Sequence, residues 1–348
     1  MKGGVAFLLL AASQYHLWSK LSSGSVFAPE FPRGIVMLFN WAFGLIALLA
    51  IIQVLLDLGT LTVVLARWQR VTVPDGVRYA AAGVAATLAA FAVANATRVP
   101  AVRDIEIGIR GLPPQFEGYR VLQLTDLHIS RLFPASWSRR VVARANAAGV
   151  DLIVVTGDFI DGSVAMRRAD VAPLRALRAV DGVYAIPGNH EYFFDYDDWM
   201  RELAAMGLRL LLNAHAVLAR DGARLVLAGV TDLSASQHGR PGPDLGAALA
   251  GAPRGAPIVL LDHQPKMAAR ARAAGVALQL SGHTHGGMIV GLDRLVARAN
   301  NGFVSGRYDV DGMTLYVSNG TALWPGFALR LGRPAEMTRI TLRAATPE

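Results

Sequence analysis

The stretch Leu278-Gln-Leu-Ser-Gly-His-Thr-His-Gly-Gly287 joins an alternating run of apolar and polar residues to two histidines separated by one residue. Such alternation predicts a β-strand, and histidine is the commonest metal ligand among the side chains. The adjoining glycines carry no Cβ atom, so the chain can turn sharply there and bring ligands close together. A metal site at His283 and His285 also requires ligands from elsewhere in the chain.

Four other strand-like runs end in similar polar residues. Residues 120–125 lead to Asp126 and His128, 151–156 to Asp158, 183–187 to Asn189 and His190, and 257–262 to His263. Side chains two residues apart in an extended chain point the same way, so Asp126 and His128 can hold one ion together. Sites in open α/β sheets form at the carboxyl ends of strands. The five strand ends together predict a metal site.

Helical segments alternate with these runs, which predicts a layered α/β domain over residues 104–345. The helices are expected over Trp137–Ala148, Val171–Ala179 and Trp199–Met206. Antiparallel strands are expected over residues 292–295, 302–310, 312–317 and 336–342. About 240 residues are ample for one buried core.

Residues 1–100 have a different composition and predict a membrane region. The whole chain is 53% hydrophobic and only 17% charged, against about 25% charged residues in an ordinary soluble domain. Basic and acidic residues number seven and three in residues 1–100 and 27 and 23 in the remainder, so each part carries a net charge of +4. This spread of charge excludes a concentrated nucleic-acid-binding face. The absence of cysteine excludes disulfides and thiolate ligands.

Three apolar stretches, residues 3–19, 34–66 and 79–97, predict about three transmembrane helices. A cleaved signal peptide would account for the first stretch but for neither of the others. Asp57 is expected near an interface, because acidic groups are costly inside a bilayer. Three crossings place Arg67, Arg70 and Arg78 together on one side. The positive-inside rule then favours a multi-pass protein of the cell membrane with its large domain outside the cytoplasm, although Arg98, Arg103 and Arg110 favour the opposite orientation.

The five blocks resemble the signature of the calcineurin-like metallophosphoesterase superfamily over residues 104–345. Within it, the chain is most similar to the membrane-associated bacterial branch that includes UDP-2,3-diacylglucosamine phosphodiesterases. The resemblance is carried by Thr125-Asp-Leu-His-Ile-Ser, Pro187-Gly-Asn-His-Glu-Tyr-Phe and Ser281-Gly-His-Thr-His-Gly-Gly. It implies a four-layer α/β/β/α sandwich, preceded here by transmembrane helices.

The resemblance also implies a site with two divalent ions, which the donor types allow to be Mn, Fe or Zn. Asp126, His128 and His285 would hold the first ion, Asn189, His263 and His283 the second, and Asp158 would bridge them. A metal-activated hydroxide would attack a phosphoester or phosphodiester, with a lipid-linked or nucleotide-linked substrate favoured. His190 would act as general acid or stabilise charge, or would only orient its neighbour. Asp161 is interpreted as a turn residue or a hydrogen-bond acceptor behind the ligands.

Two other functions remain open at this point. A protein of the same fold could keep the metal for stability and serve as a non-catalytic binding protein or scaffold at the membrane, although the complete ligand set argues against this. A transporter would need more polar intramembrane residues than Asn40, Gln53 and Asp57. Aromatic residues flank the first and third blocks, either as an apolar lip for a lipid-linked substrate or as ordinary half-buried loop residues.

Overall fold

The structure is a computed structural model that describes residues 2–345, within which the chain separates into two compact units. The helical unit comprises the residues up to Arg98 together with Pro325–Leu331. The α/β unit comprises Val99–Trp324 and the residues from Gly332 onward. The helical unit therefore includes a short segment that lies more than 220 residues after its helices in the sequence.

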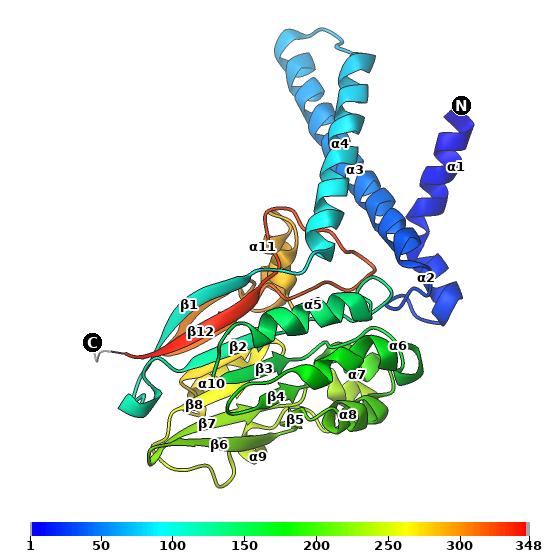
Figure 1. The fold of residues 1–348 in the computed structure, drawn as a ribbon. Coiled ribbons are helices and arrows are strands. Elements are labelled where there is room, and N and C mark those ends of the chain that lie inside the picture. The colour runs from blue at the N-terminus through cyan, green and yellow to red at the C-terminus, as the bar shows by residue number, and fades with distance from the viewer. Residues whose placement is uncertain (1, 346–348) are drawn as a thin grey trace. The chain divides into compact units, whose positions relative to one another are not determined.

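The helical unit contains α1 (Lys2–Ser13), α2 (Tyr15–Ser23), α3 (Arg33–Arg67) and α4 (Asp75–Thr97), and α3 packs against α4 (Figure 1). Helices α3 and α4 have 35 and 23 residues and are long and apolar enough to cross a membrane. The first apolar stretch, expected as one span, is instead divided into α1 and α2 by a turn at Gln14. With 12 and nine residues, each is shorter than the ~20 residues that a crossing requires.

Two six-stranded sheets form the α/β unit. In spatial order, the first contains β1 (Val102–Ile109), β12 (Met337–Ala344), β2 (Arg120–Leu124), β3 (Leu152–Thr156), β4 (Val183–Ile186) and β5 (Arg209–Leu210). The second contains β10 (Gly306–Val310), β11 (Met313–Val317), β9 (Leu278–Ser281), β8 (Ile258–Leu261), β7 (Ala223–Gly229) and β6 (Ala214–Arg220). Strands β2, β3 and β4 are mutually parallel, as are β7, β8 and β9. Each parallel set therefore presents its carboxyl ends at one edge of its sheet.

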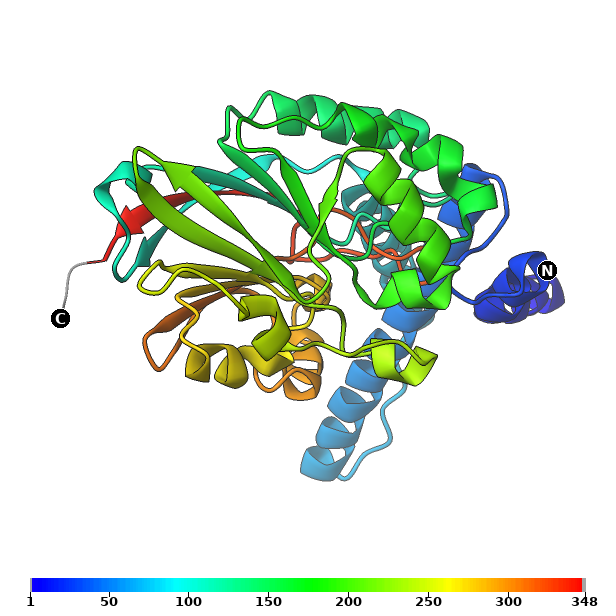
Figure 2. The ribbon, with the colours of Figure 1, turned by 90° about the horizontal axis from the view of Figure 1, so that it is seen from below.

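Helices cover the outer faces of both sheets (Figure 2). Helices α5 (Ala135–Asn146), α6 (Val164–Val171) and α8 (Tyr196–Ala205) lie on the first sheet, and α9 (Leu245–Leu249) and α10 (Ala268–Ala273) lie on the second. The short helices α7 (Asn189–Phe193) and α11 (Asp293–Ala299) follow β4 and β9 in the chain. The predicted four-layer α/β/β/α sandwich is confirmed.

The main core lies between the two sheets. It is built from fully buried residues of both, such as Val154 and Ile340 from the first and Leu227 and Leu280 from the second. Burial of each such side chain contributes about 1.5–3 kcal/mol relative to exposure. A smaller core, including Ala248, joins the second sheet to its covering helices. The inner core fixes the two sheets against each other and so fixes the spacing of the loops at their edges.

The strand predicted over residues 292–295 is wrong, because Asp293–Ala299 form helix α11. The N-cap residue Leu292 and the helix residues Leu295 and Val296 have the i, i+3, i+4 spacing of a helix. Asp293 in the first turn also interacts favourably with the helix dipole. The strand expected over residues 302–310 is confined to β10, Gly306–Val310.

The helix predicted over Val171–Ala179 is also misplaced. Helix α6 ends at Val171, and only a 3-10 segment, Ala172–Ala176, follows it. The N-cap of α6 is Ser163, whose side chain accepts a hydrogen bond from the Met166 amide at 3.4 Å. The polar cap, rather than the later Ala/Arg-rich composition, locates this helix.

Candidate metal centre

The structure brings all the predicted site residues to one place, where the loops after β2, β3, β4, β8 and β9 meet. The first three loops come from one sheet and the last two from the other. A buried hydrogen bond links the sheets directly behind the site, from the Gln123 side chain on β2 to the Ser281 main-chain oxygen on β9 at 3.0 Å. The carboxyl ends of both parallel sets therefore converge, as their connectivity predicts.

Several of these residues have a backbone conformation that L-amino acids rarely adopt. The φ angles are 54° at Asp126, 42° at His128, 55° at Asp158, 68° at His283 and 52° at His285. Each such residue costs about 1–3 kcal/mol and persists only where its surroundings enforce it. The amides of Asp126 and His128 are held by the Gly157 and Asp158 carbonyls, both at 3.0 Å. This concentration of strain coincides with the polar cluster.

One group of possible ligand atoms contains Asp126, His128 and His285. Asp126 Oδ1 lies 4.0 Å from His128 Nε2 and 3.6 Å from His285 Nε2. The Nδ1 atom of His128 faces Asp161 Oδ2 at 3.1 Å, so the other ring nitrogen is directed toward Asp126 and Asp158. A carboxylate that binds one ring nitrogen commonly orients the imidazole of a metal ligand.

The Nε2 atom of His128 tests whether these residues fit a metal ion. It is buried and makes no hydrogen bond to any residue that the structure describes. Buried polar atoms are otherwise nearly always paired, because an unpaired one costs about 1–3 kcal/mol. Imidazole and carboxylate donors directed at one point suit a divalent cation, so the residues fit the metal that the donor pattern implies.

A second group contains Asp158, His263 and His283. Asp158 Oδ2 lies 3.3 Å from His263 Nε2 and 3.7 Å from His128 Nε2, so this carboxylate stands between the two groups. His263 donates Nδ1–H to the Thr156 carbonyl at 2.7 Å, which orients its ring so that Nε2 faces Asp158. The Asn189 side-chain oxygen lies 3.1 Å from His263 Nε2 and 2.9 Å from His283 Nδ1.

His190 lies beside both groups and contacts a different carboxylate. Its Nδ1 atom lies 2.5 Å from Asp161 Oδ1, and its Nε2 atom lies 4.0 Å from Asp158 Oδ2. Asp161 thus contacts two imidazoles, one through each oxygen, and is fully buried. Of the two interpretations of Asp161, the geometry favours the hydrogen-bond acceptor behind the ligands.

Glycines permit the close approach of these loops. A Cβ atom at Gly157 would lie 2.6 Å from the Gly188 Cα and 2.8 Å from His263 Nδ1. A Cβ atom at Gly188 would lie 2.6 Å from the Asp158 amide nitrogen, and one at Gly282 would overlap Asp126 and its neighbour. Side chains at these three positions would force the loops apart.

Burial and neighbouring charge set the protonation of the metal-free site. Burial lowers the pKa of His283 to about 3, which keeps this imidazole neutral, as metal binding requires. Burial by itself would raise the pKa of Asp158. The surrounding imidazoles outweigh this effect and hold the pKa of Asp158 well below its usual range. Burial also lowers the pKa of His190, but Asp158 and Asp161 reverse this and raise it to about 9.

Glu191 supports the site and was missed in the sequence analysis. Its buried carboxylate accepts hydrogen bonds from the amides of Gly188 at 2.7 Å, Asp158 at 3.0 Å and Phe159 at 2.8 Å. It therefore ties the loop after β3 to the loop after β4. Its position directly after His190, in a Gly-Asn-His-Glu sequence, was the available signal.

The loop after β11 also reaches the site and was missed. The amides of Thr321 and Ala322 donate to the carbonyls of Thr125 and Asp126 at 2.8 and 2.9 Å. A Cβ atom at Gly320 would lie 3.1 Å from both Asp126 Cβ and His285 Nδ1. Its signal is Ser318-Asn-Gly-Thr at the end of an apolar strand, without a carboxylate or imidazole to mark it.

Only some of the aromatic residues that flank the first and third blocks are exposed enough to form the apolar lip considered for a lipid-linked substrate. Trp137 and Trp199 are fully buried and belong to the core. Phe193 is 36% exposed, and its ring lies 5.1 Å from that of His190. His238, to which the sequence assigned no role, lies against Phe193 with 5.8 Å between ring centroids.

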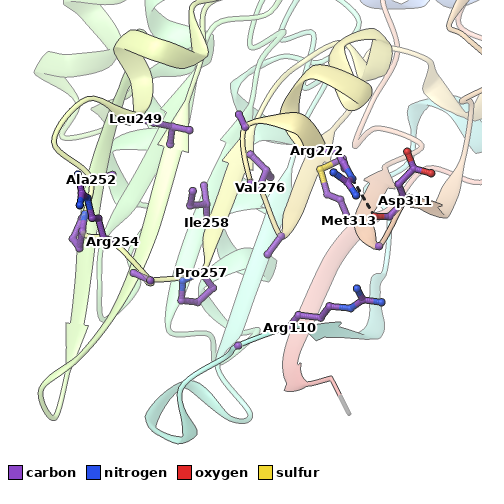
Figure 3. A pocket seen from close by; sticks show the side chains of 18 of the residues that line it. Arg110, Leu249, Ala252, Arg254, Pro257, Ile258, Arg272, Val276, Asp311 and Met313 are labelled. Atoms are coloured by element: carbon purple, nitrogen blue, oxygen red, sulfur yellow. Dashed lines mark hydrogen bonds between the residues drawn. The ribbon is translucent and has the colours of Figure 1, made fainter. Parts of the chain in front are cut away.

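A cavity of 610 Å³ lies elsewhere, at the amino-terminal ends of β8, β9 and β11 (Figure 3). Its lining includes Arg110, Arg254 and Arg272 as well as apolar residues such as Ile258, and Arg272 donates to the Asp311 main-chain oxygen at 3.1 Å. None of the predicted site residues lines it. The candidate metal centre and this cavity are therefore separate sites.

Comparisons with known proteins agree with the geometry. Residues 119–287 match the family model of the calcineurin-like phosphoesterases. A protein from Danio rerio named transmembrane protein with metallophosphoesterase domain is 35% identical over 271 residues, which are 75% of this chain and 62% of the relative. The Bos taurus protein of the same name is 35% identical over 274 residues, 75% of this chain and 61% of the relative.

An uncharacterized metallophosphoesterase from Campylobacter jejuni is 30% identical over 251 residues, 72% of this chain and 65% of the relative. The chain thus spans less than two thirds of the length of these three relatives. The family match includes every predicted site residue, from Asp126 to His285. The resemblance inferred from the five blocks is confirmed, and residues 119–287 of the chain are a calcineurin-like phosphoesterase domain.

Proposed function

We propose that the chain is a membrane-anchored phosphoester hydrolase that works with two divalent metal ions. The observation that carries the proposal is the position of Asp158, whose Oδ2 lies within 4.0 Å of imidazole nitrogens of His128, His263 and His190. A carboxylate placed between two groups of metal ligands offsets the repulsion between two cations. Those imidazoles come from three different loops, so the arrangement depends on the complete fold.

The proposed ligand sets follow the two groups. Asp126, His128 and His285 would hold the first ion, Asn189, His263 and His283 the second, and Asp158 would contribute to both. These oxygen and nitrogen donors suit Mn, Fe or Zn, and the protein contains no thiolate to favour Zn alone. When bound, such a pair lowers the pKa of a water molecule and neutralises charge on phosphoryl oxygens.

His190 is proposed to act on the phosphoryl group or on the leaving oxygen. Asp161 fixes its Nδ1 atom, so the ring is oriented with Nε2 toward the Asp158 side. An imidazole held in this way can donate a proton or a hydrogen bond to a developing negative charge, an effect worth about 10²–10⁴ in rate. The alternative role, in which His190 only orients Asn189, predicts a much smaller loss on its removal.

The favoured substrate is a lipid-linked or nucleotide-linked phosphodiester. Helices α3 and α4 support membrane anchoring, and the two vertebrate relatives are named transmembrane proteins. The partly exposed ring of Phe193 beside His190 offers an apolar contact for the non-phosphate part of a substrate. The arginines at 67, 70 and 78 favour an extracytoplasmic active site.

The test is hydrolysis of bis-p-nitrophenyl phosphate by the full-length protein in detergent, with Mn, Fe or Zn supplied in turn. We expect turnover with at least one metal, a fall of about 10²-fold or more in His190→Ala, and near-complete loss in Asp158→Asn. Gln53→Leu, a change in α3, is the matched control and should keep wild-type activity. Absence of turnover with every metal, or equal activity in the two site variants and wild type, would contradict the proposal.

The substrate class is tested by adding detergent-dispersed lipid phosphodiesters to the same assay. A lipid-linked substrate should have a higher kcat/KM than its water-soluble headgroup analogue, with the difference reduced in Phe193→Ala. Equal kcat/KM values for the two substrates would contradict lipid recognition and leave the nucleotide-linked class.

A further inference from the structure

Residues Pro325–Leu331 are a segment of the helical unit that is apolar except for the buried Arg330, although they follow β11 in the sequence. Ala328 and Leu329 are buried, with at most 2% of their surface exposed. The segment contains no helix or strand, so its main-chain polar groups need partners within the helical unit. Those partners identify which helix residues hold it.

Asn40, on the apolar helix α3, supplies most of these partners. Its amide nitrogen donates to the Pro325 carbonyl at 2.8 Å and to the Val36 carbonyl at 2.9 Å. Its oxygen accepts from the Ala328 amide at 2.6 Å. Tyr15 donates its hydroxyl to the same Pro325 carbonyl at 2.7 Å. The polar side chain of Asn40 is therefore used to bind the segment, which accounts for a buried amide among apolar residues.

Apolar contacts hold the rest of the segment. A Cβ atom at Gly44 on α3 would lie 2.8 Å from a methyl carbon of Leu329, so this position accepts the Leu329 side chain because it is glycine. Phe327 packs edge-on against Phe43, with 6.0 Å between ring centroids. The Arg330 amide donates to the Ala92 carbonyl of α4 at 3.1 Å. Both long helices thus contact the segment.

Both ends of the segment continue directly into loops of the metal centre. Pro325 comes three residues after Ala322, whose amide is bonded to the Asp126 carbonyl at 2.9 Å. Gly332 follows the other end and forms a β-bridge with Ile289, four residues after His285. Only a few residues of chain therefore connect the segment to the hydrogen bond at Asp126 and to the bridge that follows His285.

We propose that segment 325–331 is a strap through which the helices position the first ligand group. Asn40 and Tyr15 are its positioning residues, because they fix the Pro325 carbonyl. Release of the strap would loosen the loop at residues 318–322 and would lower the affinity of Asp126 and His285 for the first ion. The inference about affinity rests on the proposed function, whereas the coupling of the loop to the helices does not.

The test is amide hydrogen exchange of the full-length, metal-free protein in lipid nanodiscs, comparing wild type with Asn40→Leu. The substitution removes the hydrogen bonds from Asn40 to Pro325 and Ala328. We expect exchange at least about threefold faster at the Thr321 and Ala322 amides, as well as within the strap. Mn²⁺ titration should show weaker binding of one of the two ions.

Three further variants separate coupling from general damage. Gln53→Leu removes a polar group from the same helix that donates to Asp57 rather than to the segment, and it should change neither readout. Tyr15→Phe removes one hydroxyl from the same carbonyl and should give a smaller effect of the same kind. Gly44→Ala displaces Leu329 without touching Asn40 and should reproduce the Asn40→Leu pattern. The two milder variants keep the test decisive if Asn40→Leu does not fold.

Faster exchange confined to residues 325–331, with residues 318–322 unchanged, would overturn the strap. Unchanged Mn²⁺ affinity despite faster exchange in both regions would overturn the positioning role of Asn40. A wild-type chain that bound no Mn²⁺ would contradict the proposed function instead, and the exchange comparison would still decide the coupling.

Discussion

The substitution Gly188→Ala perturbs the site at its centre without changing any proposed ligand. Gly188 precedes Asn189 and packs against Asp158, the carboxylate between the two ligand groups. Its φ angle is −101°, a value that alanine adopts readily, so the substitution introduces no backbone strain. The effect of the added methyl group is therefore steric.

The magnitude follows from the distances. The new Cβ atom would lie 2.6 Å from the Asp158 amide nitrogen and 2.9 Å from its carboxyl carbon, whereas ordinary contact begins at 3.4 Å. Relief requires a shift of at least about 0.8 Å, because the Cβ atom would lie closer still to Asp158 Oδ1, and this is several times the ~0.2 Å tolerance of a metal–ligand distance. We expect metal affinity to fall about 10–100-fold and turnover about 10²-fold. Folding stability should fall by only about 1–3 kcal/mol.

The assay combines metal analysis of the purified full-length protein with turnover of bis-p-nitrophenyl phosphate across a Mn²⁺ titration. Gly246→Ala is the matched control, because its Cβ atom would meet only the Asp244 carboxylate, at 3.2 Å. It should bind metal and turn over substrate like wild type. If Gly188→Ala also retained wild-type metal affinity and turnover, the placement of Asp158 at the metals would be refuted.

Three further predictions concern the support of the site and the topology. Glu191→Gln should destabilise the fold by about 3 kcal/mol, which corresponds to a fall of about 6–12 °C in Tm. The reason is that one of the two acceptor oxygens of Glu191 becomes a donor that faces main-chain N–H groups. An unchanged melting curve would contradict this prediction. In metal-free protein the raised pKa of His190 should stabilise the fold fully below its unfolded value of 6.5, and this contribution should be lost as pH rises through about 9. Melting curves between pH 6 and 10 measure it, and Asp161→Asn should flatten the profile. A reporter fused after residue 348 should be active only outside the cytoplasm, and a cytoplasmic signal would reverse the proposed orientation.

The residues at the strand ends were predictable because strand periodicity and residue chemistry are local properties. Apolar runs ending in Asp, Asn or His mark where parallel strands deliver side chains, and the two-sheet core brings those ends together. Asp161 was recognisable as a polar turn residue, but its contact with both His128 and His190 depends on the bend after β3. Local pattern predicts such a residue without predicting its partners.

Features formed by distant segments could not be predicted in the same way. Capture of Pro325 by Asn40 joins positions 285 residues apart, and a mostly apolar heptapeptide carries no signal for its partner. Helix α11 was mistaken for a strand, although Leu292–Leu295 reads Leu-Asp-Arg-Leu and its apolar residues have the i, i+3 spacing of a helix. The first apolar stretch divides at Gln14, although its composition is that of one helix. Tertiary contacts decide these cases.

The most direct test of the central claim is metal analysis with electron paramagnetic resonance of the Mn²⁺-loaded, full-length protein, beside Asp158→Asn. The proposed arrangement predicts two Mn²⁺ ions per chain and the spectrum of a magnetically coupled pair, both lost or reduced in the variant. A single uncoupled ion in the wild type, or a coupled pair that persists unchanged in Asp158→Asn, would contradict a dinuclear centre bridged by Asp158.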